Sequence, residues 1–116
     1  MLTDIQKRWI DALRSGKYKK GKKFLCSHGH YCCLGVACVI LGLEGKESVG
    51  SVYFGGRNRV FAPNAVKELG LRSPLGLLKE PHKDLVSLGD MNDRGDFTFE
   101  QIADYIEANP GNVFVQ

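Results

Sequence analysis

The sequence predicts one compact α+β domain, spanning residues 1–116, in which two short β-hairpins pack against three to four helices, one of them buried. The chain length of 116 residues suits a single hydrophobic core but not two. Hydrophobic residues make up 43% and charged residues 25%, which is ordinary for a globular domain. Neither an internal repeat nor a low-complexity segment interrupts the chain, so we expect one domain.

The N-terminus has no apolar segment behind a basic one, and therefore does not resemble a secretory signal. The longest apolar run, residues 34–43, contains glycines and is far shorter than the ~20 residues of a membrane span. We therefore expect a cytoplasmic protein with no membrane partner. In a reducing cytosol, the four cysteines are expected to be buried thiols or metal ligands rather than disulfides.

A capping box, formed by Thr3 and Gln6, predicts a first helix over about residues 4–15. Gly16 ends this helix, and Trp9, the only tryptophan, lies on its apolar face. We expect Trp9 to anchor the core.

Residues 14–23, here called the basic loop, carry six cations and two glycines. Because glycines in such a run disfavour a helix, the segment is predicted to be a loop that leads into a strand. Its lysines and glycine N–H groups could act as a flexible clamp on phosphate groups. The alternative is a solvated surface that only contributes to solubility. The net charge of +3 permits a polyanionic partner without requiring one.

Residues 24–33 are predicted to form the first hairpin, which turns at Gly29. The following run, about residues 32–41, has no polar face and is predicted to be a buried helix. A buried strand over Val36 to Leu41 is the alternative for this short run. Gly35 is expected to mark the close approach of another backbone segment.

In the second half, residues 51–61 are predicted to form a second hairpin that turns at residues 55–58, after a polar loop. A helix is predicted from Pro63 to Leu69, with Gly70 as its end. Residues 72–83 resemble an irregular connection. A second capping box, formed by Thr98 and Gln101, begins the last predicted helix, which Pro110 helps to end.

The residues that we expect to bind an anionic ligand are of three kinds: cations, an aromatic residue next to a cation, and polar residues on a turn. Tyr53 and Phe54 add aromatic faces beside two guanidinium groups, which together can stack a base and bind a phosphate. The alternative is a packed strand with exposed arginines. The candidate set is Lys17, Tyr18, Lys19, Lys20, Lys22, Lys23, Arg57, Arg59, Asn92 and Asp93.

The cysteines and histidines of residues 26–38 suggest a second kind of chemistry. Zinc prefers four such ligands, and the candidates are Cys26, His28, His30 and Cys32. However, no Cys-x-x-Cys pair is present, so we favour buried thiols, exposed turn histidines and no cofactor. A catalytic cysteine would need a positioned base, for which only His28 or His30 is close in sequence.

Several segments in order resemble a family of small uncharacterised proteins of tailed bacteriophages and prophages. The matching segments are Trp9 to Lys22, Tyr31-Cys-Cys-Leu-Gly-Val-Ala-Cys38, Pro63 to Leu71, Met91-Asn-Asp-x-Gly95 and Phe99 to Glu107. Members share the Cys-Cys-Leu-Gly-Val-x-Cys pattern but lack the Cys26-Ser-His-Gly-His30 insertion. The resemblance implies a phage-encoded protein and weakens the zinc interpretation, and it supplies no catalytic residues.

We therefore expect a phage-encoded accessory protein that binds an anionic partner, a nucleotide-type small molecule or nucleic acid, and could act against host defence. A first alternative is a protein–protein inhibitor whose basic loop docks on an acidic host protein. A second is a small Cys/His enzyme or zinc-binding protein. Self-association is also compatible with so small a domain.

Overall fold

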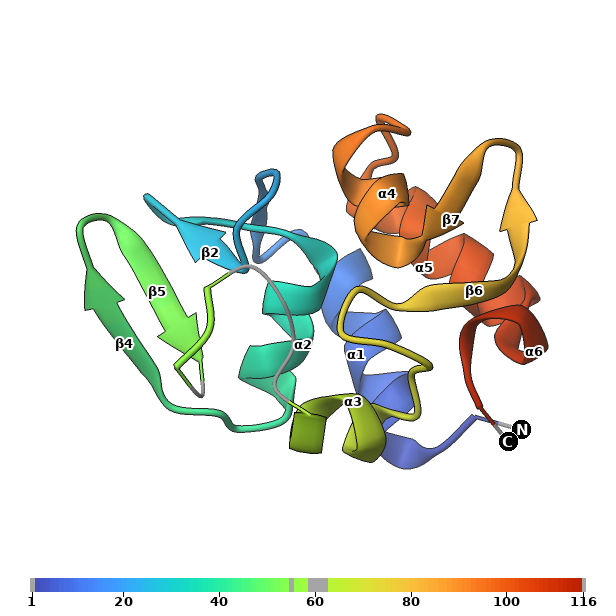
Figure 1. The fold of residues 1–116 in the computed structure, drawn as a ribbon, viewed down its shortest axis with the longest axis horizontal. Coiled ribbons are helices and arrows are strands. Elements are labelled where there is room, and N and C mark those ends of the chain that lie inside the picture. The colour runs from blue at the N-terminus through green and yellow to red at the C-terminus, as the bar shows by residue number, and fades with distance from the viewer. Residues whose placement is uncertain (1, 55, 59–62, 116) are drawn as a thin grey trace.

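The computed structural model describes residues 2–54, 56–58 and 63–115, and confirms a single small α+β domain (Figure 1). The described helices are α1 (Asp4–Arg14), α2 (Cys33–Ile40), α3 (Pro63–Leu69), α4 (Leu88–Asp93), α5 (Phe99–Ala108) and α6 (Pro110–Val113). The described strands are β1 (Lys19–Lys20), β2 (Cys26–Ser27), β3 (His30–Tyr31), β4 (Gly45–Ser48), β5 (Ser51–Phe54), β6 (Leu77–His82) and β7 (Leu85–Ser87). Within the described ranges, none of the helices has the length and hydropathy that spanning a membrane requires.

Two separate sheets flank the helices at the centre of the molecule. Strands β1 to β5 form one sheet in the order β1-β3-β2-β5-β4, and β6 pairs with β7 in the other. Strand β1 runs parallel to β3, whereas the remaining pairs are antiparallel. Figure 1 shows β4 and β5 at one end of the molecule, β6 and β7 with α4 to α6 at the other, and α1 and α2 between them.

The first predicted hairpin is confirmed by strands β2 and β3, which pair Cys26 with Tyr31 and Ser27 with His30. Its two turn residues, His28 and Gly29, have positive φ angles of 52° and 79°, as a type I′ turn requires. The predicted buried helix follows as α2, with Cys33 to Cys38 all buried.

The polar loop predicted before the second hairpin is wrong, because it contains strand β4. Strand β4 pairs with β5, and their turn consists of Val49 and Gly50, with φ angles of 51° and 82°. A β-branched residue rarely adopts positive φ, so Val49 gives no turn signal. At the predicted second hairpin, Phe54 and Arg57 form an antiparallel bridge, whereas residues 55 and 59–61 lie outside the described part.

The irregular connection predicted for residues 72–83 is also wrong, because it contains β6. Pro81 argues against a strand, but proline is tolerated on edge strands, and both strands of a two-stranded sheet are edges. The side chain of Asn112 replaces a missing neighbour strand for β6: its Oδ1 accepts from Glu80 N at 2.7 Å, and its Nδ2 donates to Glu80 O at 3.0 Å.

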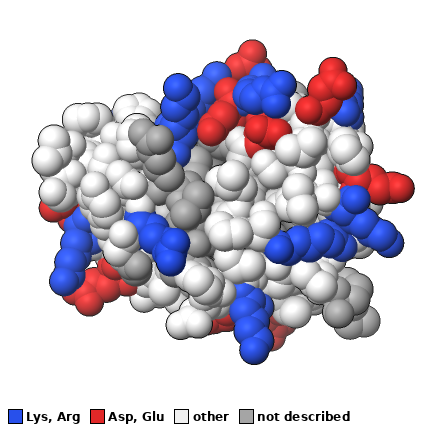
Figure 2. All heavy atoms as spheres, in the orientation of Figure 1, with Lys and Arg blue, Asp and Glu red and all other residues white. Residues whose placement is uncertain are grey.

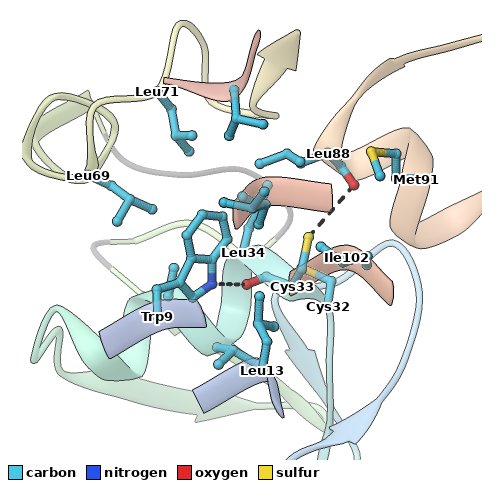
Figure 3. Packing of buried hydrophobic residues seen from close by; sticks show 14 of the residues in the cluster. Trp9, Leu13, Cys32, Cys33, Leu34, Leu69, Leu71, Leu88, Met91 and Ile102 are labelled. Atoms are coloured by element: carbon cyan, nitrogen blue, oxygen red, sulfur yellow. Dashed lines mark hydrogen bonds between the residues drawn. The ribbon is translucent and has the colours of Figure 1, made fainter. Parts of the chain in front are cut away.

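The core lies where α1, α2, α4 and α5 meet (Figure 3). Trp9 is fully buried, and its Nε1 donates to Cys33 O at 2.9 Å. Both predicted capping boxes are present and begin α1 and α5. Arg14 at the end of α1 forms ion pairs with Asp104 and Glu107 of α5, at 2.7 and 2.8 Å.

The predicted close approach at Gly35 is confirmed. A Cβ atom at this position would overlap the carbonyl oxygen of Leu25, which is backbone and cannot rotate away. The same oxygen accepts from Cys32 N at 3.2 Å. The first turn of α2 is therefore in direct contact with the backbone that precedes β2.

We predict that Gly35→Ala lowers the free energy of unfolding by about 3 kcal/mol or more, because α2 must move away from Leu25. Urea titration followed by circular dichroism measures this change. Gly111→Ala is the matched control: a Cβ there meets nothing within 4 Å, so stability should stay close to wild type. Equal effects of the two substitutions would contradict the close packing.

Candidate anion-binding site

The basic loop rests on the C-terminal end of α4 through the side chain of Asn92. This side chain is fully buried. Its Nδ2 donates to Gly21 O at 2.9 Å, and its Oδ1 accepts from Cys33 N at 3.0 Å. Asn92 was predicted to contact ligand, but its amide is used to join the loop to the start of α2.

Two further contacts fix the loop on α4. Lys20 Nζ donates to Asn92 O at 2.7 Å, where the carbonyl groups at a helix C-terminus favour a cation. The Lys23 N–H donates to Asp93 Oδ1 at 3.0 Å, so Asp93 also has a structural role. On its other side, the Gly21 N–H donates to Tyr31 O at 2.7 Å. The loop backbone is thus held from both sides.

The predicted lysines divide into engaged and free groups. Burial lowers the pKa of the engaged Lys20, and neighbouring Lys22 adds to this effect. Lys22 pairs with Asp96 at 3.2 Å, with both side chains largely exposed; such pairs contribute about 0–1 kcal/mol and exchange readily with other partners. Within the described part of the chain, the ammonium groups of Lys17, Lys19 and Lys23 have no hydrogen-bond or ion-pair partner.

Figure 2 shows Lys and Arg side chains interleaved with Asp and Glu side chains on the surface around α4. The two ion pairs there join Lys22 to Asp96 and Arg94 to Asp90. Because of this neutralisation, an anion that approached the loop would meet its free lysines rather than its total charge.

Lys17 and Tyr18 belong to a second part of the surface. A hollow of about 330 Å³ is lined by Arg8, Asp11, Ala12, Ser15, Lys17, Tyr18 and Ile40. Arg8 and Asp11 had not been predicted as site residues. The one feature of the sequence that could have pointed to them is their spacing, which places them on the same face of α1 as Ala12 and Ser15.

One of the two predicted arginines, Arg57, lies within the described part of the chain. It is exposed beside the end of β5. The neighbouring Asn58 O accepts from Leu25 N at 2.7 Å, so this segment lies against the backbone that follows the basic loop. Arg59 lies outside the described residues.

All four cysteines are free and buried. Burial raises the pKa of the Cys32 thiol to about 11 and that of Cys38 to about 12, and raises that of Cys33 well above its ordinary value. These thiols are protonated at neutral pH and are therefore poor nucleophiles. Cys32 Sγ instead caps α2 by accepting from Gly35 N at 3.3 Å.

The zinc alternative required Cys26, His28, His30 and Cys32 to converge. The two cysteines are buried, whereas both histidines are exposed, His28 on the hairpin turn and His30 in β3. Throughout residues 2–54, 56–58 and 63–115, no three His, Cys, Asp or Glu side chains are grouped so that they could hold a metal ion.

We predict that Asn92→Ala lowers the free energy of unfolding by about 2–4 kcal/mol, because it leaves Cys33 N–H and Gly21 O without partners. Chemical denaturation measures this loss. Asn64→Ala, an exposed position in α3, is the control and should change stability by less than about 0.5 kcal/mol. Equal stabilities of the two variants would rule out this role for Asn92.

The raised thiol pKa values predict that stability falls in alkali. The unfolded chain loses its thiol protons near the ordinary pKa of 9.0, whereas folded Cys32 keeps its proton to about pH 11. The stabilisation is therefore complete below pH 9 and is lost as the pH rises toward 11. For Cys32, it is on the order of 2–3 kcal/mol. Cys32→Ser, which can retain the helix cap, should show a shallower fall between pH 9 and 11, and an unchanged slope would contradict this assignment.

Comparison with protein families matches residues 1–110 to a domain of unknown function, DUF8296. Comparison with curated proteins gives no match, and neither does comparison with solved structures. Because the family match covers almost all of the 116 residues, the chain belongs to the DUF8296 family.

Proposed function

We propose that the protein is a phage-type accessory protein that binds an anionic partner, a nucleotide-type small molecule or nucleic acid, through the basic loop. The observation that supports this proposal most strongly is a loop, fixed by Asn92, on which three lysines have no ion-pair partner among the described residues. These lysines, Lys17, Lys19 and Lys23, are all exposed.

A fixed loop is favourable for binding because fewer backbone conformations are lost when the ligand docks. Lysine ammonium groups act as mobile point charges that suit phosphate oxygens without demanding one geometry. Lys22 can add a fourth charge by leaving its exposed pair with Asp96. Lys20, by contrast, serves the fold and is not part of the proposed binding surface.

An acidic host protein would use the same lysines, so the two kinds of partner must be separated by experiment. Nucleic-acid binding releases counterions, and its affinity falls steeply with salt by an amount set by the number of phosphates contacted. Binding to a protein surface that includes apolar contacts depends less on salt.

We predict that the triple variant Lys17→Gln, Lys19→Gln, Lys23→Gln loses binding to labelled single-stranded DNA, duplex DNA and nucleotides at low salt. Fluorescence anisotropy and equilibrium dialysis measure this loss. The control variant Lys7→Gln, Lys67→Gln, Lys79→Gln carries the same change in net charge at exposed positions elsewhere and should bind as wild type does.

The proposal is wrong if the wild-type protein binds nothing in this panel at low salt, or if both triple variants lose binding equally. The second result would show that only net charge matters. In either case, an acidic protein partner becomes the better hypothesis.

A further inference from the structure

We propose that the hollow between α1, the basic loop and the end of α2 binds a nucleoside monophosphate. This inference rests on the proposed anion-binding function and specifies its ligand. The hollow has a volume of about 330 Å³, which is at the lower end of the ~300–1,000 Å³ typical of small-molecule sites. It therefore suits one nucleotide rather than a larger cofactor.

One side of the hollow is a straight stripe on α1. Arg8, Asp11, Ala12 and Ser15 are spaced so that they fall on the same face of the helix. The helix is rigidly placed, since the Trp9 side chain is hydrogen-bonded to Cys33 O and Arg14 forms ion pairs with α5. These charged side chains therefore project from a fixed support.

The apolar part of the hollow can accept a base. Ala12, Tyr18 and Ile40 all line it. The Tyr18 ring is held in place by an edge-to-face contact with Tyr31, with ring centroids 5.2 Å apart and planes at 80°. Packing of a base against an aromatic side chain stabilises binding and tolerates any base.

The charged part suits a single phosphate. Arg8 and Lys17 supply two positive charges, and Asp11 supplies one negative charge on the same lining. The Asp11 carboxylate can accept hydrogen bonds from ribose hydroxyls, but it repels additional phosphates.

The Ser15 hydroxyl is used in hydrogen bonds within the protein rather than for the ligand. It donates to Ala12 O at 2.6 Å and accepts from Lys17 N at 3.1 Å. These two bonds instead hold Lys17 close to the end of α1. The positive charge that meets the phosphate therefore comes from Arg8 and Lys17.

The test is calorimetric titration of the full chain with AMP, adenosine, ribose 5-phosphate and ATP. We expect AMP to bind more tightly than the other three ligands. Arg8→Gln and Lys17→Gln should each weaken AMP binding by about ten-fold or more, since each removes a charge-assisted contact. Lys79→Gln, an exposed lysine outside the hollow, should leave it unchanged. Asp11→Asn should reduce the preference for AMP over ATP.

Two results would overturn the inference: AMP binding that survives Arg8→Gln, in a variant shown to be folded by circular dichroism, or ribose 5-phosphate binding as tightly as AMP. If DNA binds through Lys19 and Lys23 while AMP does not bind at all, the inference fails and the proposed function stands. If no anion binds at low salt, the proposed function itself fails.

Discussion

The structure depends on the start of α2, where both the N–H and the carbonyl of Cys33 form hydrogen bonds inside the core. Its N–H donates to Asn92 Oδ1, and its carbonyl accepts from Trp9 Nε1. Gly35, two residues further on, lies against the backbone of Leu25. A buried backbone group without a partner costs about 1–3 kcal/mol, so α1, α4 and the segment before β2 must all be in place together.

The same constraint connects the core to the surface. Asn92 bonds Gly21 as well as Cys33, and it thereby orders the basic loop through the contact that positions α2. The lysines consequently have different roles. Lys20 is part of the fold, while Lys17, Lys19 and Lys23 are exposed and have no ion-pair partner within the described residues. A loop of this composition would otherwise be mobile, because glycine and solvated lysine both favour disorder.

The elements that local chemistry specifies could be predicted from the sequence: two capped helices, the buried α2 and the close contact at Gly35. Strands β4 and β6 could not, because Val49 adopts a conformation rare for its residue type and because β6 is completed by the distant Asn112. For the candidate site, the concentration of lysines in the basic loop is a local property that the sequence shows directly. The contact of Asn58 with Leu25, and the burial of Asn92, arise only from tertiary packing.

The contacts of Asn92 and Tyr31 hold the basic loop as rigidly as the core, and amide hydrogen exchange measured by NMR tests this rigidity. The Gly21 N–H, bonded to Tyr31 O, and the Cys33 N–H, bonded to Asn92 Oδ1, should both exchange only on global unfolding. Both should then show the same dependence on denaturant. If the Gly21 N–H exchanged at the rate of an unprotected loop while the Cys33 N–H stayed protected, the loop would be mobile on a rigid core, and Asn92 would not hold it in place.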